Sequence, residues 1–73
     1  MYITKSEKKV LELIYLTNKQ IAKILFIDAT TVKSHIHNLL KKYKAQTRTE
    51  LFIKAVKNND IDLVKIMEAQ NEF

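Results

Sequence analysis

The chain has 73 residues, a net charge of +5, and no glycine, proline or cysteine. A chain of this length forms one domain at most and buries a small core, so we expect marginal stability. The lack of cysteine excludes disulfide bridges and thiolate metal sites. No apolar run is long enough to cross a membrane, and the first 16 residues are too charged for a signal peptide, so we expect a cytoplasmic protein without membrane association.

The charge is unevenly distributed along the chain. Residues 1–57 carry twelve basic and four acidic side chains, a net +8, whereas residues 58–73 carry one basic and four acidic side chains, a net −3. A basic body of this kind suits a polyanion such as nucleic acid, and an acidic tail does not. A solvated, lysine-rich surface explains the charge equally well.

Capping patterns and apolar spacing divide the chain into helices. Three Thr-x-x-Glu/Gln patterns fit capping boxes, and an aspartate is a fourth N-cap candidate: Thr4 with Glu7, Thr17 with Gln20, Thr47 with Glu50, and Asp28. The spacing predicts helices over residues 5–15, 18–25, 29–43 and 48–57 or 58, and a weaker helix over residues 60–68. The run Asn58-Asn59-Asp60 is the expected break before the last helix, because Asn tolerates the left-handed conformation.

No strand is predicted, so the expected fold class is all-α. The apolar cluster Leu25-Phe26-Ile27 is too short for a strand between two capped helices and is interpreted as a buried turn. Without glycine, turns that need a positive φ must use Asn, Asp or Lys.

Residues 17–43 have the form of a short helix, a tight turn and a longer helix. Ala22 is small where the two helices must approach, Val32 begins a buried stripe ten residues later, and Phe26 and Ile27 are expected to fill the turn. This pattern is typical of a helix-turn-helix, in which the second helix enters the major groove of DNA.

The predicted helix over residues 29–43 has two different sides. Its buried stripe comprises Val32, Ile36, Leu39, Leu40 and Tyr43. The opposite side carries no acid and offers Thr30, Lys33, Ser34, His37, Asn38 and Lys41. Such groups can hydrogen-bond base edges and phosphates. An ordinary solvated face is the less favoured interpretation, because most such faces mix both signs of charge.

Several motifs in register resemble one known family. Residues 17–35, TNKQIAKILFIDATTVKSH, resemble S-N-K-E-I-A-x-x-L-F-I-S-x-x-T-V-K-x-H, the signature of the LuxR/GerE-type (NarL/FixJ-like) helix-turn-helix family. Residues 4–11, TKSEKKVL, resemble its opening T-x-R-E-x-E-V-L, and Arg48-Thr49-Glu50 resembles its late N-R-T-E. The connection between Ile14 and Thr17 is two residues shorter than is usual in the family, which affects how the first helix docks. Ser6 replaces a family arginine, which removes one expected ion pair.

The resemblance, over about residues 3–57, implies a four-helix fold whose third helix lies in the major groove and whose fourth helix pairs two subunits. Carried over by position, it implies that Lys33, Ser34 and His37 face bases and that Lys19 touches a phosphate. It also implies backbone contacts, or support of the helix start, by Thr31, His35, Asn38 and Lys41. Together with Thr30, these residues form the predicted DNA-binding set: Lys19, Thr30, Thr31, Lys33, Ser34, His35, His37, Asn38 and Lys41.

Other chemistry finds little support in the sequence. His35 and His37 are two residues apart on a helix, which does not suit a shared metal ion. No nucleophile–base pair, glycine-rich loop or carboxylate pair is present, so we expect no catalytic, metal or cofactor site and no small-molecule ligand. His35 is equally well interpreted as a partly buried histidine bonded to a carbonyl.

The predicted helix over residues 48–57 is apolar on two sides. Leu51, Phe52 and Ala55 form one side, and Ile53 and Val56 lie on another. We expect Ile53 and Val56 to form a homodimer interface, chiefly because the resemblance implies one. The alternative is that Ile61, Val64 and Met67 of the tail cover these two residues.

The sequence thus predicts a helix-turn-helix DNA-binding domain over residues 1–58 and a C-terminal extension over residues 59–73 that forms a short helix. The expected function is sequence-specific duplex-DNA binding by a homodimeric transcription regulator, not an enzyme. We expect a stand-alone regulator, and the alternative is an effector domain cut from a longer protein. The alternative is a protein-interaction module that keeps this scaffold, no longer binds DNA and uses its acidic tail. A sigma-factor-like helix-turn-helix is a nearer alternative, which Lys33-x-His35 and Arg48-Thr49-Glu50 disfavour.

Overall fold

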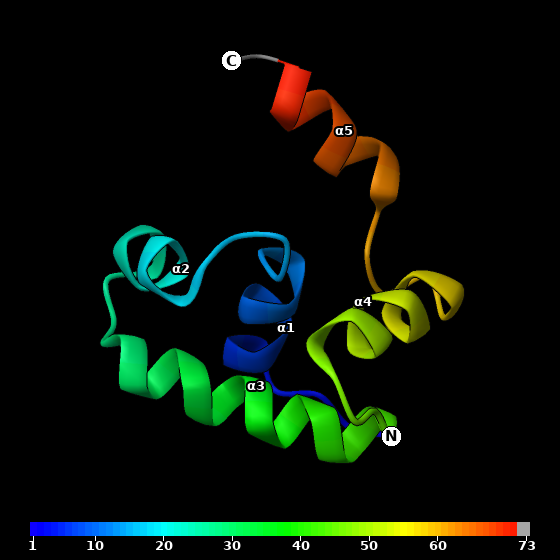
Figure 1. The fold of residues 1–73 in the computed structure, drawn as a ribbon, viewed down its shortest axis with the longest axis horizontal. Helices are drawn as coiled ribbons and strands as arrows, with labels where there is room; N and C mark the ends of the chain where they lie inside the picture. The colour runs from blue at the N-terminus through cyan, green and yellow to red at the C-terminus, as the bar shows by residue number, and fades with distance from the viewer. Residues whose placement is uncertain (72–73) are drawn as a thin grey trace.

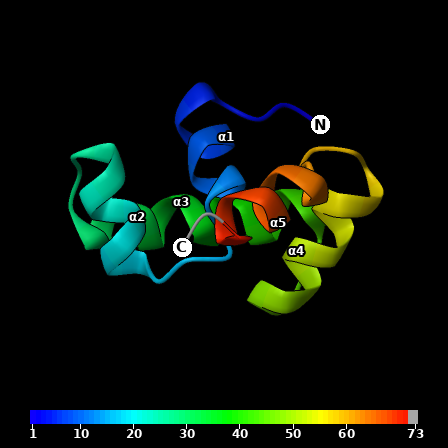
Figure 2. The same ribbon diagram turned by 90° about the horizontal axis from the view of Figure 1, so that it is seen from above.

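The computed structural model describes residues 1–71, which form five α-helices and no strand (Figure 1). The helices are α1 (Lys5–Glu12), α2 (Asn18–Leu25), α3 (Ala29–Tyr43), α4 (Arg48–Lys57) and α5 (Leu63–Asn71). The expected all-α class is confirmed. The long α3 is the platform of the fold, because α1, α2 and α4 all pack against it. Figure 2 shows α2 and α4 on opposite sides of α1 with α3 running behind them, and α5 projects away from this body in Figure 1.

Two of the three predicted capping boxes are complete. The Glu7 amide donates to Thr4 Oγ1 (3.1 Å) and the Thr4 amide donates to Glu7 Oε1 (2.9 Å), and Thr17 and Gln20 repeat this reciprocal pair at 3.2 and 3.0 Å.

The other two predicted caps need correction. Thr47 accepts from the Glu50 amide (3.0 Å), but the Glu50 carboxylate turns to the Gln46 amide (3.2 Å), so this third box stays open. Asp28 has the extended backbone of an N-cap and makes no side-chain capping bond.

Three helix boundaries differ from expectation by three residues: the end of α1 and both ends of α5, which runs over Leu63–Asn71 where residues 60–68 were expected. The first helix ends at Glu12, and tight turns follow in which the Leu13 amide donates to Val10 O (3.1 Å) and the Ile14 amide to Leu11 O (3.2 Å). The short connection forces this tightening, because the chain must reverse before Thr17 caps α2. At the other end, α5 begins at Leu63 because the Asp62 carboxylate accepts from the amides of residues 64 and 65 and so caps the helix there.

Among residues 1–71, three adopt a positive φ, and none of them is a glycine: Phe26 (56°), Lys44 (54°) and Asn59 (60°). Lys and Asn were expected in this role, and Asn59 marks the predicted break. The expectation that Phe26 fills a buried turn is wrong. Its side chain is 93% exposed, because the left-handed residue that ends α2 turns outward while its half-buried neighbours Leu25 and Ile27 pack inward.

The core lies between α3 and the helices above it. Its largest fully buried side chains are Leu11, Ile21, Leu39, Leu51, Val10 and Val32. Each such aliphatic side chain contributes about 1.5–3 kcal/mol relative to exposure, so these residues are a large part of the hydrophobic stabilisation. The alternative in which the tail covers α4 is corrected here: Ile61 is buried, whereas Val64 and Met67 are 62% and 58% exposed.

Polar bonds between helices complete the body. Glu7 is 3% exposed, and its carboxylate accepts from Lys42 Nζ (2.6 Å), which ties the start of α1 to the end of α3. The hydrogen bond from Lys42 and that from the Thr4 amide hold the pKa of Glu7 below its usual value, against the effect of burial. The Tyr43 hydroxyl donates to the Asp60 carboxylate, and burial and this bond raise the pKa of Tyr43. Lys8 Nζ also donates to Asp60 O (2.7 Å).

Candidate nucleic-acid interface

The unit formed by α2, its turn and α3 is fixed from within. Ile21 and Ala22 of α2 are buried against Val32 of α3, and the Ile27 amide donates to Ala22 O (3.0 Å) across the turn. The small side chain of Ala22 allows this close approach, as the sequence predicts. Because α2 and α3 are anchored in one core, the packing against α2 fixes the direction in which the solvent-exposed side of α3 points.

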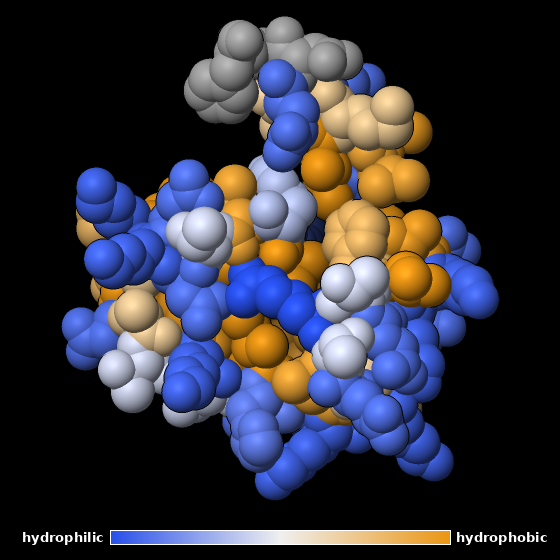
Figure 3. Space-filling model, in the orientation of Figure 1, coloured by the Kyte–Doolittle hydropathy of each residue, from blue (hydrophilic) through white to orange (hydrophobic). Residues whose placement is uncertain are grey.

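The exposed side of α3 collects almost the whole predicted DNA-binding set. Eight of the nine predicted side chains are exposed: Lys19, Thr30, Thr31, Lys33, Ser34, His37, Asn38 and Lys41. The ninth, His35, is half-buried; this agrees with the burial in its alternative interpretation, and the carbonyl bond of that interpretation stays a prediction. Thr30, Ser34, His37 and Lys41 recur every three or four residues, so they form one stripe opposite the buried side. Figure 3 shows hydrophilic side chains along the lower edge of the molecule, where α3 lies.

The electrostatics of α3 favour an anionic ligand. The helix has no acidic residue over its 15 positions, and Asp28, directly before it, is the nearest acid in the sequence. Three exposed cations, Lys19, Lys33 and Lys41, accompany hydroxyl, amide and imidazole groups. This combination provides phosphate partners and base-edge donors and acceptors on α3 and at the start of α2.

Arg48 holds in place the short connection between α1 and α2, whose conformation the sequence did not predict. Its guanidinium donates to Ile14 O through Nε (3.2 Å) and Nη2 (3.1 Å), to Leu16 O, and through Nη1 to Asn18 Oδ1 (2.6 Å). Burial lowers its pKa, yet a guanidinium remains charged in proteins. Arg48 therefore positions the start of α2, and with it Lys19. The sequence marked Arg48 as part of a motif, but this structural role was missed.

Further basic residues are also engaged inside the protein. Lys54 Nζ donates to Lys44 O (2.8 Å) and Tyr43 O (3.3 Å), and so satisfies carbonyls at the end of α3. Lys8, Lys42 and Arg48 likewise donate to protein acceptors. Four of the twelve basic residues in the first 57 positions thus stabilise the fold. The other eight are exposed, and four of these lie on α2 and α3: Lys19, Lys23, Lys33 and Lys41.

The fourth helix presents a mixed surface. Leu51 and Ala55 are buried in the core, Phe52 and Val56 are half-buried, and Ile53 is 47% exposed. Phe52 and Val56, which the sequence placed on different sides, are therefore alike in burial and both pack against the core, and Ile53 is the apolar residue of α4 that points toward solvent.

Residues 1–71 lack two further features. Over this part of the chain, no group of three or more His, Cys, Asp or Glu side chains is placed to hold a metal ion. No helix in the same range is long and apolar enough to span a membrane.

Comparison with known proteins agrees with this geometry. Residues 1–55 match the family described as "Bacterial regulatory proteins, luxR family". The chain belongs to this family. It is therefore a LuxR/GerE-type helix-turn-helix DNA-binding domain of a transcriptional regulator, and not an enzyme.

Relatives within the luxR family differ in how much of their length is matched. The chain is 44% identical over 57 residues to the transcriptional regulatory protein YxjL of Bacillus subtilis, covering 75% of this chain and 26% of YxjL. It is 46% identical over 59 residues to YhcZ of the same species, covering 78% of this chain and 28% of YhcZ. The spore germination protein GerE of B. subtilis is 33% identical over 63 residues, covering 84% of this chain and 85% of GerE. The chain thus spans about a quarter of YxjL and YhcZ and most of GerE.

Proposed function

We propose that this chain regulates transcription by binding duplex DNA sequence-specifically, as a homodimer, with α3 in the major groove. The observation that carries the proposal is the exposed side of α3, which has no acid and lies on a helix whose other side is locked in the core. Lys33, Ser34 and His37 would read base edges. A role on chromosomal DNA implies a cytoplasmic protein.

The remaining predicted residues would position the domain on the duplex. Lys19 at the start of α2 is exposed and would neutralise a phosphate, and Lys41 would do so at the other end of α3. Thr30, Thr31, His35 and Asn38 would contact the backbone or support the first turns of α3. The DNA-binding domain would end at Asn58, the C-cap of α4, and residues 59–73 would form the extension.

Homodimerisation would pair α4 of two subunits through Ile53 and Val56. One domain covers a few base pairs, whereas a two-fold dimer reads two half-sites at a fixed spacing. The partial exposure of both side chains supports this part of the proposal.

Selection from a random pool of duplex DNA, followed by anisotropy titration, tests the proposal. We expect a preferred sequence with two-fold symmetry, bound more tightly than its scrambled version. Binding should weaken steeply with salt, with a log–log slope of roughly −0.9 per phosphate neutralised. Failure to enrich any sequence, together with a flat salt dependence, would instead support the protein-interaction module.

A further inference from the structure

The extension helix α5 is apolar on two opposite sides and buries one of them. Ile66 and Ala69, three residues apart, are half-buried and face the body. On the other side, Leu63, Val64 and Met67 are 42%, 62% and 58% exposed. Three large apolar side chains on nine residues are thus left in contact with water.

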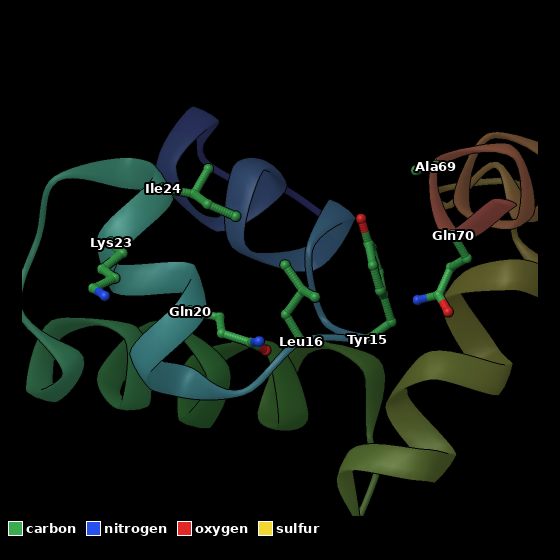
Figure 4. A pocket seen from close by; sticks show the side chains of 7 residues that line it. All are labelled: Tyr15, Leu16, Gln20, Lys23, Ile24, Ala69 and Gln70. Atoms are coloured by element: carbon green, nitrogen blue, oxygen red, sulfur yellow. The ribbon is translucent and has the colours of Figure 1, made fainter. Parts of the chain in front are cut away.

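The contact between α5 and the body is loose. A groove of about 630 Å³ separates the helix from α2 and the α1–α2 connection, and it is lined by Tyr15, Leu16, Ile24 and Ala69 among others. Figure 4 shows Ala69 and Gln70 on the α5 side of this groove and Ile24 on the α2 side. A helix of nine residues is unstable in isolation and depends on the burial of an apolar face. An additional partner on its exposed side would therefore stabilise it substantially.

The exposed side of α5 continues onto α4. Ile53, 47% exposed, lies on α4, and Figure 3 shows hydrophobic side chains running from α5 toward the end of α4. By itself α4 offers Ile53 and the half-buried Val56, which is little for a specific interface that usually buries about 1,200–2,000 Å². The three exposed residues of α5 enlarge this surface to one of more suitable size.

Charge indicates which partner fits. The first 57 residues carry a net +8, so two copies of the body repel each other, whereas residues 58–73 carry a net −3. Within α5 itself, Lys65 and Glu68 balance, so two copies of this helix can meet without net repulsion. A second copy can therefore approach at α5 without the repulsion that opposes contact between two basic bodies.

We infer that α5 forms part of the homodimer interface, where Leu63, Val64 and Met67, together with Ile53 of α4, pack against the same surface of a second copy. This inference rests on the proposed homodimer and extends its interface beyond α4. Figure 1 shows α5 on the side of the body away from α3, so the contact leaves α3 free for DNA in both subunits.

Single-cysteine variants test the interface directly, because the chain has no cysteine and each variant carries one thiol. Met67→Cys and Ile53→Cys are treated with a short bis-maleimide at micromolar protein, with the exposed Lys9→Cys on α1 as control. We expect Met67→Cys to form covalent dimers at least about tenfold faster than Lys9→Cys. If Ile53→Cys cross-links rapidly and Met67→Cys only at the control rate, the dimer uses α4 alone and the role of α5 is refuted. If neither exceeds the control, the homodimer itself is refuted as well.

A matched pair of charge variants provides an independent readout. Met67→Glu and Gln70→Glu each add one negative charge to α5, and Gln70 lies on the side that lines the groove. Sedimentation equilibrium should show a dimer dissociation constant raised about tenfold or more by Met67→Glu and unchanged by Gln70→Glu. Circular dichroism verifies that the body stays folded. A wild-type dissociation constant for Met67→Glu would overturn the inference.

Discussion

Two groups of basic side chains in this small domain have different roles. Lys8, Lys42, Arg48 and Lys54 lie at the junctions between helices and donate to carbonyls or carboxylates of the protein. The exposed cations of α2 and α3, such as Lys33, face solvent on the acid-free side. The difference teaches that net charge overstates what is free to bind DNA, because a third of the positive charge in the first 57 residues is already engaged in the fold.

Among these changes, replacing Arg48 at the junction between helices should lower the unfolding free energy most. Arg48→Ala leaves Ile14 O, Leu16 O and Asn18 Oδ1 without their donor, so we expect a loss of about 2–3 kcal/mol in unfolding free energy. Chemical denaturation followed by circular dichroism measures this.

Two further variants sharpen the result for Arg48. Arg48→Lys keeps the charge without the planar fork and should recover only part of the loss. Lys57→Ala, an exposed lysine of α4, serves as control and should change stability little. Equal stability of Arg48→Ala and Lys57→Ala would contradict the positioning role of Arg48.

Replacing Glu7 should lower the unfolding free energy by a smaller amount, and this loss should depend on pH. The Lys42 bond lowers the pKa of Glu7 in the folded state, so the ionised form stabilises the fold at pH values above about 4.5 and this stabilisation is lost as the pH falls through the lowered pKa. Glu7→Gln should therefore cost about 1–2 kcal/mol at pH 7. The gap to wild type should shrink toward pH 3.

Denaturation curves at several pH values measure this difference. Glu50 is the natural control: hydrogen bonds from the Gln46 amide and Lys54 also lower its pKa, but its carboxylate is far more exposed to solvent than that of Glu7. Glu50→Gln should thus show a weaker pH dependence. A pH-independent gap for Glu7→Gln would show that the ion pair does not stabilise the body.

The sequence predicted most of the fold because its local signals agree with one another. The starts of α2, α3 and α4 follow from Thr17, Asp28 and Thr47, and the buried stripe of α3 follows from helical spacing. The turn after α2 was mispredicted because apolar character suggested burial for Phe26. The left-handed backbone, adopted at a non-glycine residue, decides instead that its side chain points outward.

Long-range contacts were the part that local patterns could not reveal. The guanidinium of Arg48 reaches residues more than 30 positions earlier, and Lys42 pairs with Glu7 over 35 positions. Neither pairing leaves a periodic signal. The exposed DNA-binding set, by contrast, follows from one helix and its spacing, so its placement in solvent was predictable.

The most direct test of the central claim compares Lys33→Ala with Lys9→Ala, two exposed lysines on α3 and α1. Binding of both variants to the selected duplex and to its scrambled version is measured by anisotropy at one fixed salt concentration. If the exposed side of α3 reads bases, Lys33→Ala loses about 1–3 kcal/mol on the selected duplex and much less on the scrambled one, while Lys9→Ala changes neither appreciably. Equal losses for Lys33→Ala on both duplexes, or none on either, would contradict base reading by this side of α3.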